Sequence, residues 1–365
     1  MSKRMRLGLV GLGGVAQEHM RGIAASDRLV LAAGADINSD RASKSAADYG
    51  LKPYSDVTSM IANEALDGIL VLTPPQFHLP VIKVAMNAGL PVLCEKPLAA
   101  SRSDAEAIRN IVLQTGRAFQ FGASYRFLPA IREAREIVQS GALGVIRCCS
   151  ESLIGGQGAE AVESLSPVHY PEGGPGGTPM GLVDHGVHLI DAISWITGLA
   201  PTSVFGRGNI SGDHPLAESV LMTLERGALV SLSYDEGTFG LSLPGSGVFT
   251  EGAGWNVDGF VSAGSYDAYP CILTIHGSDG ALRIYPYANR LYHADADGLR
   301  QVPVDPLPNP NHFRLQAEEF GRAIRGEAQP GWAAGLDDGL AALDAVLGVY
   351  ESQKSGRVVT LNYPD

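Results

Sequence analysis

Two histidines and two aspartates interrupt an otherwise apolar stretch, GLVDHGVHLID, at residues 181–191. Such groups are seldom buried without a partner or a function. They can ligate a metal, run acid/base chemistry, or satisfy one another inside a core. Acid/base chemistry suits the residue types, because a histidine can act as a base near neutral pH. His188 is our candidate for that base.

The spacing of these residues assigns them different parts. Asp184 precedes His188 by four residues, about 40° away around a helix, so it can orient the imidazole and stabilise its cation. Asp191 falls on the same face, whereas His185 points about 100° away and is expected to be structural. Asp184, His188 and Asp191 could also supply three ligands to zinc or manganese. The chain has no second His/Cys cluster at ligand spacing, so we expect no metal.

A glycine-rich loop near the N-terminus predicts an electron acceptor. In GLGGVA, Gly11, Gly13 and Ala16 follow an apolar strand and open a helix with the spacing G-x-G-x-x-A. The first glycine permits a tight turn, the second lets backbone N–H groups approach a pyrophosphate, and the small third residue lets helix and strand pack closely. With Gly14 and Val15, these residues form the expected dinucleotide-binding loop.

Asp36 ends the second candidate strand, 20 residues beyond Ala16. A carboxylate there accepts hydrogen bonds from the adenosine ribose hydroxyls. Because an acidic side chain repels a 2′-phosphate, the expected cofactor is NAD. Arg41 nearby leaves the use of NADP open.

Strands and helices alternate regularly in the segment that must position these residues. The strands are dense in Val, Leu and Ile, as in parallel strands covered on both faces. The alternation predicts a doubly wound parallel sheet of the Rossmann type over residues 1–123. The expected strands span 5–11, 29–36, 68–75 and 91–97, and the expected helices span 15–26, 40–49, 56–64, 77–88 and 102–115.

From residue 124 onward the pattern changes to extended runs joined by tight turns, at Arg226-Gly227 and Asp279-Gly280. Such turns are typical of an antiparallel sheet. We expect an α+β domain over 124–365, built on a large open, mainly antiparallel sheet. Helices are expected at 128–140, 182–197, 312–325 and 335–354, and the last two can pack back near the Rossmann domain.

Five motifs carry a family resemblance: GLGGVA (11–16), TPPQFH (73–78), CEKP (94–97), SYRFLPA (124–130) and DHGVHLID (184–191). In this order they resemble the Gfo/Idh/MocA (glucose-fructose oxidoreductase/inositol dehydrogenase) family over nearly the whole chain. The resemblance implies a Rossmann domain followed by a large open antiparallel sheet. It also implies an NAD(P)-dependent oxidoreductase that transfers a hydride to or from one carbon of a sugar, cyclitol or related polyol.

The resemblance also implies roles for residues at the strand ends. Thr73, Pro74 and His78 would lie along the cofactor, near the nicotinamide. Glu95 and Lys96 would lie where cofactor and substrate meet. The Lys96 ammonium could hydrogen-bond the reacting oxygen and stabilise negative charge developing on it.

In the second domain, the resemblance makes Asp184 and His188 the substrate-facing acid/base pair. Arg126 can bind a polyol or carboxylate, or form an ion pair between domains. Two other functions stay open: a sensor that binds NAD or a sugar without turnover, and a reductase or dehydrogenase for a glycoside or a nucleotide-linked sugar. The presence of Lys96 together with this pair favours an enzyme.

Composition limits the partners and the compartment. The chain has 365 residues, a formal net charge of −12 and scattered basic residues, which argues against nucleic acid. No apolar run approaches the ~20 residues that a membrane span needs. The four cysteines form neither a CxxC pair nor a zinc spacing, which is typical of a reducing, cytoplasmic compartment.

Two features point to association and to binding loops. The open sheet of the second domain carries apolar runs such as SVLMTL and needs cover, which predicts a homodimer or homotetramer. The glycine-rich segments 155–181 and 237–267 are too long for ordinary connections and are expected to be binding loops, lids or oligomer contacts.

Overall fold

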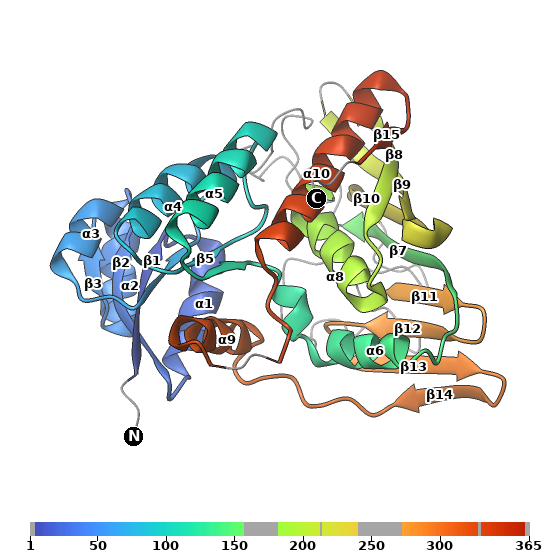
Figure 1. The fold of residues 1–365 in the computed structure, drawn as a ribbon, viewed down its shortest axis with the longest axis horizontal. Helices are drawn as coiled ribbons and strands as arrows, with labels where there is room; N and C mark the ends of the chain where they lie inside the picture. The colour runs from blue at the N-terminus through green and yellow to red at the C-terminus, as the bar shows by residue number, and fades with distance from the viewer. Residues whose placement is uncertain (1–3, 157–181, 212–213, 240–271, 328–329, 362–365) are drawn as a thin grey trace. The chain divides into compact units, whose positions relative to one another are not determined.

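The protein folds into two compact units (Figure 1), in a computed structural model that describes residues 4–156, 182–211, 214–239, 272–327 and 330–361. The first unit comprises Met1–Phe127 and Leu307–Leu340, and the second comprises Leu128–Pro306 and Ala341–Asp365. The first boundary thus falls four residues beyond the expected one. The C-terminal segment Leu307–Leu340 belongs to the first unit, which helical periodicity alone does not indicate.

Within the described residues, the first unit holds a six-stranded parallel sheet of order β3-β2-β1-β4-β5-β6. This is an order typical of dinucleotide-binding sheets, in which ligands bind outside the carboxyl ends of the strands. The strands are β1 (Met5–Val10), β2 (Leu29–Ala35), β3 (Lys52–Tyr54), β4 (Gly68–Val71), β5 (Val92–Cys94) and β6 (Phe119–Phe121). The helices are α1 (Gly14–Ala24), α2 (Ser39–Tyr49), α3 (Val57–Asn63), α4 (His78–Asn87), α5 (Arg102–Thr115) and α9 (Phe313–Arg325), with 3₁₀ turns η1 (Pro75–Phe77) and η2 (Ser124–Phe127).

Helix limits in this unit follow local capping signals. Ser101 precedes α5, and its Oγ accepts a hydrogen bond from the backbone N–H of Asp104 at 3.1 Å. Gly116 ends the helix with φ +60°, a left-handed conformation that glycine adopts without a Cβ penalty. The predicted helix 102–115 is confirmed at both ends. Its limits could be predicted because both capping signals are local.

The expected strands were too long at their carboxyl ends. The run 68–75 leaves the sheet after Val71, and Pro75 opens η1. The run 91–97 ends as a strand at Cys94. Strands β3 and β6 were not predicted, because three residues are too few to show a periodic pattern.

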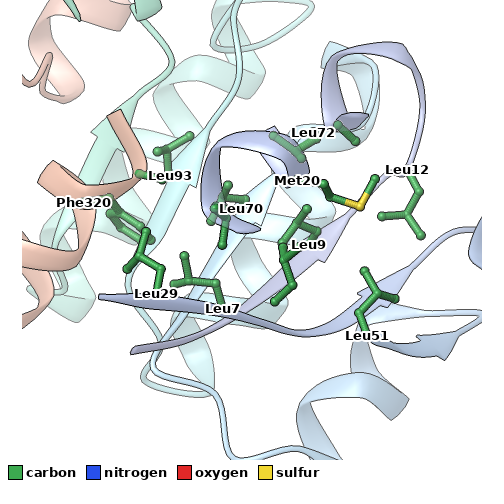
Figure 2. Close-up of a cluster of buried hydrophobic side chains, with 14 of the residues drawn as sticks. Leu7, Leu9, Leu12, Met20, Leu29, Leu51, Leu70, Leu72, Leu93 and Phe320 are labelled. Carbon is green, nitrogen blue, oxygen red and sulfur yellow. The ribbon is translucent and has the colours of Figure 1, made fainter. Parts of the chain in front are cut away.

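A hydrophobic cluster joins the sheet of this unit to α1 and α9. Figure 2 shows Leu7, Leu9 and Leu70 from the strands beside Met20 of α1 and Phe320 of α9. All five side chains are fully buried. This packing attaches α9 to the first unit.

The second unit is built on a nine-stranded sheet, within the described residues, of order β14-β13-β12-β11-β7-β10-β9-β8-β15. Neighbours pair antiparallel except β7 and β10, so the sheet is mainly antiparallel, as predicted. The strands are β7 (Ile146–Gly156), β8 (Pro201–Ser211), β9 (His214–Leu224), β10 (Leu229–Phe239), β11 (Leu273–Gly277), β12 (Ala281–Tyr285), β13 (Arg290–Asp295), β14 (Gly298–Val302) and β15 (Val359–Thr360).

Both predicted hairpins are confirmed. Arg226 and Gly227, in the short turn η5 (Glu225–Gly227), have φ of +59° and +80°, which tight hairpin turns require. Strands β11 and β12 pair antiparallel across Asp279 and Gly280. The strands of this unit are therefore joined where the turn residues indicated.

The second unit also contains helices α6 (Pro129–Gln139) and α8 (Val187–Thr197) and most of α10 (Leu336–Ser355). Helix α6 contacts α8 and strands β12 and β13. Gly348 of α10 lies against Val204 of β8, where an added Cβ would be 3.0 Å from the valine. Only the first turn of α10, to Leu340, belongs to the first unit.

Candidate functional site

The glycine loop has the backbone shape that the sequence predicts. Gly11 has φ +87°, and a Cβ built on it would lie 2.8 Å from the backbone of Leu72 and Thr73. No side chain fits there, so the loop passes directly against the end of β4. The tight turn between β1 and α1 therefore depends on this glycine.

The N-terminus of α1 is open to a ligand. A Cβ added at Gly13 or Gly14 would meet no atom within 4 Å, and no described side chain caps the helix. The first backbone N–H groups of a helix lack internal acceptors and favour an anion. Ala16 is buried where the helix meets the sheet, and Val15 packs partly against the same core. These residues fit a dinucleotide pyrophosphate.

Asp36 holds the glycine loop from the end of β2. Its Oδ2 accepts the backbone N–H of Leu12 at 2.8 Å, and its Oδ1 accepts that of Asn38 at 2.7 Å. Each carboxylate oxygen has a second acceptor position. The side chain can therefore shape the loop and still accept from a ribose hydroxyl.

The TPPQFH segment combines a buried threonine hydroxyl that lacks a hydrogen-bond partner among the described residues with a structural histidine. The Thr73 hydroxyl oxygen is buried and has no hydrogen-bond partner among the described residues. Pro74 precedes η1, and His78 begins α4. The His78 ring is fully buried, with Nε2 2.7 Å from the carbonyl oxygen of Thr73 and Nδ1 3.1 Å from that of Leu98. Burial lowers the pKa of His78. A neutral ring donates from Nε2 to Thr73 and accepts at Nδ1 from the Cys94 thiol, whose sulfur lies 3.2 Å away.

Glu95 and Lys96 directly follow β5. Oε2 of Glu95 accepts the backbone N–H of Lys96 at 3.0 Å, while Oε1 lies 2.8 Å from Nε2 of His19. Glu95 is buried and Lys96 is half-buried. The carboxylate is thus bonded inside the protein, and the lysine is the partly exposed group of the pair.

Arg126 is buried in the first unit and forms an ion pair with Asp338. Its Nη2 lies 2.7 Å from Oδ1 of Asp338, in the first turn of α10. Of the two roles expected for Arg126, an ion pair is present, within one unit and not between domains, and contact with substrate stays a prediction.

In the second unit, the candidate acid/base segment is not a uniform α-helix. Residues Leu182–Gly186 form a π-turn, and α8 begins at Val187. The wider π-turn changes the angle expected between Asp184 and His188. Four residues make slightly more than one turn of an α-helix but less than one turn of a π-helix. His188 and Asp191 are buried in α8, whereas the side chain of Asp184 lies outside the described residues. π-turns are frequent at functional sites.

Two buried carboxylates hold this π-turn. Oε1 of Glu151, on β7, lies 2.9 Å from Nε2 of His185. Oε2 of Glu218, on β9, accepts the backbone N–H of Leu182 at 3.2 Å. Burial raises the pKa of Glu218, and its hydrogen bonds with Leu182 and Gln353 partly oppose the rise. At Gly186 an added Cβ would be 2.9 Å from Cδ1 of Leu182 and 3.0 Å from the Tyr234 ring, so these side chains would have to shift to admit a larger residue.

Other predictions from the sequence concern a metal, two glycine-rich segments and a membrane span, and the structure tests them only for the residues it describes. Among the described residues, which leave out the side chain of Asp184, no group of three or more His, Cys, Asp or Glu could hold a metal. Most of the two glycine-rich segments, residues 157–181 and 240–267, lies outside the described residues. No helix in the described ranges is long and apolar enough to cross a membrane.

Three residues of the site were missed by sequence reasoning: His19, Glu151 and Glu218. His19 and Glu95 are 76 residues apart, and Glu151 and His185 are 34 residues apart. The available signal was a titratable residue inside an apolar helix or strand pattern.

Comparisons with known proteins agree with this geometry. Residues 5–123 match the family model described as "Oxidoreductase family, NAD-binding Rossmann fold", and residues 131–283 match the model "GFO/IDH/MocA C-terminal domain". The chain is 31% identical over 239 residues to "Rhizopine catabolism protein MocA" of Rhizobium meliloti, covering 63% of this chain and 71% of that protein. It is 29% identical over 261 residues to an inositol 2-dehydrogenase of Corynebacterium glutamicum, covering 69% and 73%.

Solved structures share the fold over the full chain. An oxidoreductase from Agrobacterium radiobacter, in complex with NAD+, L-tartaric acid and magnesium, matches with a TM-score of 0.79 at 19% identity, covering 98% of both chains. A myo-inositol 2-dehydrogenase from Lactobacillus plantarum matches with a TM-score of 0.75 at 23% identity, covering 99% of this chain and 100% of the other. At these identities the likeness shows the fold alone.

Proposed function

The chain belongs to the Gfo/Idh/MocA family of oxidoreductases, with an NAD-binding Rossmann domain, and we propose the hydride transfer that it catalyses. The proposed reaction moves a hydride between the nicotinamide and a secondary alcohol or ketone carbon of a sugar, cyclitol or related polyol. Relatives named inositol 2-dehydrogenase support a cyclitol-like substrate.

One observation carries this proposal. The open N-terminus of α1 follows β1, and Lys96 follows β5, two strands along the same parallel sheet. The carboxyl ends of parallel strands meet at one edge, where doubly wound sheets bind their ligands. The dinucleotide loop and an ammonium group suited to a reacting oxygen therefore share one edge of the first unit.

The chain's own residues would hold the cofactor at this edge. Backbone N–H groups of Gly13 and Gly14 would bind the pyrophosphate, and Asp36 would accept from the adenosine ribose. Bound NAD supplies the hydride acceptor for an alcohol, and its reduced form supplies the donor for a ketone. The Asp36 carboxylate would repel a 2′-phosphate, which supports a preference for NAD.

The protein must also provide a base that accepts the hydroxyl proton of the substrate. When the alcohol carbon gives up a hydride, the hydroxyl proton passes to His188, and the carbon–oxygen bond becomes a carbonyl. Asp184 would orient the imidazole and stabilise its cation. Lys96 would donate a hydrogen bond to the reacting oxygen and stabilise charge developing on it.

A substrate panel tests the proposal. The purified protein would be offered inositols, aldoses, anhydrosugars and glycosides with NAD or NADP, and NADH or NADPH absorbance would be followed. Reduction of NAD by a cyclic polyol or sugar is expected. Silence across the panel with both cofactors, while NADH still binds, would favour a sensor and overturn the proposal.

Substitutions test the assigned roles. Lys96→Ala and His188→Ala should each lower kcat ~10²-fold or more and leave the Kd for NADH nearly unchanged. Lys44→Ala and His276→Ala remove an exposed lysine and an exposed histidine as matched controls, and both should retain full turnover. Near-normal turnover in either test variant would refute the role of that residue.

Association through the sheet of the second unit is a further part of the proposal. Leu221 of β9 and Leu229 of β10 are 59% and 57% exposed, and they lie on the same sheet face because Leu221 pairs with Ser231. An apolar face of this kind needs cover. Sedimentation should give a homodimer or homotetramer, and Leu221→Glu should weaken it. A monomeric wild-type protein would contradict this part.

We also place the enzyme in the cytoplasm. The support is the state of the cysteines: Cys94 and Cys149 are buried free thiols, and Cys148 is an exposed one. A reducing compartment keeps such thiols free. Fractionation of cells would test the location.

A further inference from the structure

His19 is a buried histidine that the reaction scheme above does not use. It lies on α1, three residues after Ala16, with no exposed surface. Its ring packs against Phe313 of α9, with the ring centroids 4.7 Å apart. A leucine would fill such a position without a polar group to satisfy. The imidazole therefore needs an explanation beyond packing.

The explanation lies in Glu95, which connects His19 to Lys96. One carboxylate oxygen of Glu95 is 2.8 Å from Nε2 of His19, and the other accepts the backbone N–H of Lys96 at 3.0 Å. A buried carboxylate is costly unless such donors surround it. The two partners come from α1 and from the segment after β5. Glu95 therefore ties the helix that opens at the glycine loop to the lysine.

The second ring nitrogen of His19 indicates the form of the ring. Nδ1 has no hydrogen-bond partner among the described residues. A proton there would be a buried donor without an acceptor, which costs more than leaving a lone pair unused. The hydrogen-bond geometry thus favours a ring that donates from Nε2 to the Glu95 carboxylate.

The backbone around this carboxylate has little room to move. A Cβ added at Gly122, just after β6, would lie 2.8 Å from Cα of Glu95 and 3.0 Å from the backbone nitrogen of Lys96. The segment is thus pressed against the neighbouring strand on one side and bonded through Glu95 to His19. Such a segment can present a side chain in a fixed direction.

We propose that His19 is a positioning residue for the hydride-transfer reaction. It holds the Glu95 carboxylate, which fixes the backbone of Lys96 and keeps the negative charge bonded to the imidazole. This inference rests on the proposed function, because it takes Lys96 as the group that acts on the reacting oxygen. Because His19 has no exposed surface, it acts through Glu95 and not by contact with substrate or cofactor.

Kinetics of three variants test the role. His19→Leu should lower kcat about tenfold, because a small displacement of a reacting group is costly, while KM and the Kd for NADH stay within about twofold. His19→Gln, whose amide can donate from nearly the same place, should recover turnover to within about threefold. His312→Leu is the matched control, because His312 is also buried and its ring lies 4.5 Å from the same Phe313 ring. It should lower Tm and leave kcat unchanged.

A second readout does not depend on activity. The rate at which acetic anhydride acetylates Lys96 in the cofactor-free protein can be measured by mass spectrometry against Lys44 in the same sample. His19→Leu should slow this labelling about threefold, because a Glu95 carboxylate released from His19 is free to pair with the Lys96 amino group. Glu95→Gln should speed it, and His19→Gln and His312→Leu should not change it.

The two readouts separate the possible failures. Labelling that shifts as expected in a protein with no dehydrogenase activity would support the link from His19 to Lys96 and overturn the proposed function. Wild-type kcat and labelling in His19→Leu would overturn the positioning role. So would an equal loss of kcat in His312→Leu, because the effect would then come from packing. If His19→Leu does not fold, the labelling of Glu95→Gln and the recovery in His19→Gln decide.

Discussion

Oε1 of Glu151 lies 2.9 Å from Nε2 of His185, and both side chains are buried in the second unit. The pair joins β7 to the π-turn that contains Asp184. The Tyr234 ring meets the imidazole edge-on, with the centroids 5.7 Å apart. The histidine that spacing assigns to a structural role thus anchors the candidate acid/base segment to the sheet.

Removing one partner of this pair should be costly. His185→Leu should destabilise the protein by about 3 kcal/mol, because the Glu151 carboxylate stays buried without its partner. Adding Glu151→Gln to this variant should restore part of the loss, so the two changes should not be additive. Calorimetric unfolding of the single and double variants measures both effects. Additive losses would show that the two residues act separately.

The parts of the fold that could be predicted depend on local signals. Gly11 and Ala16 fix the turn and helix after β1, and Ser101 and Gly116 cap α5, all within a few residues of the element they control. The hairpin at Arg226 is equally local. Patterns of this kind predict the folded structure correctly because the backbone geometry they require is set by neighbouring residues.

The site was harder to predict because its bonds join distant segments. The residue types at His188 and Lys96 suggested chemistry, but the link from Glu95 back to His19 crosses 76 residues. The π-turn at Leu182–Gly186 is held by Glu218 from another strand, so a uniform helix of period 3.6 was the natural expectation. Membership of α9 in the first unit likewise depends on packing of Phe320 and not on helical periodicity.

Gly122→Ala should distort the lysine segment directly. The new methyl carbon would lie 2.8 Å from Cα of Glu95, a backbone atom that cannot rotate away. We expect a loss of about 1–3 kcal/mol in stability from overpacking, and about a tenfold fall in kcat. Gly335→Ala is the control, because its Cβ would meet only Oδ2 of Asp338, at 3.9 Å. Equal effects of the two substitutions on kcat would refute the special position of Gly122.

The ion pair of Arg126 and Asp338 separates a structural role from substrate binding. Asp338→Asn should lower stability by about 1.5–3 kcal/mol, because the buried guanidinium loses a charged acceptor. The KM for substrate should not change, because the role we assign to the pair is to hold the start of α10. Asp337→Asn, in the same first turn, is the control and should change stability by less than about 0.5 kcal/mol. A large rise in KM for Asp338→Asn would restore substrate contact as the role of Arg126.

Glu218 should make the second unit less stable as pH rises. Burial raises its pKa above the ordinary value of 4.5, so between that value and the raised one the folded protein binds a proton that the unfolded chain has released. Stability therefore falls through this window, and the loss is complete above it. Glu218→Gln stays uncharged, so its Tm should depend less on pH and at pH 7 should exceed the wild-type Tm by about 2–4 °C per kcal/mol recovered. Glu225→Gln removes an exposed glutamate that follows the same strand and should keep the wild-type slope. Equal slopes in Glu218→Gln and the wild-type protein would mean that Glu218 does not titrate in this window.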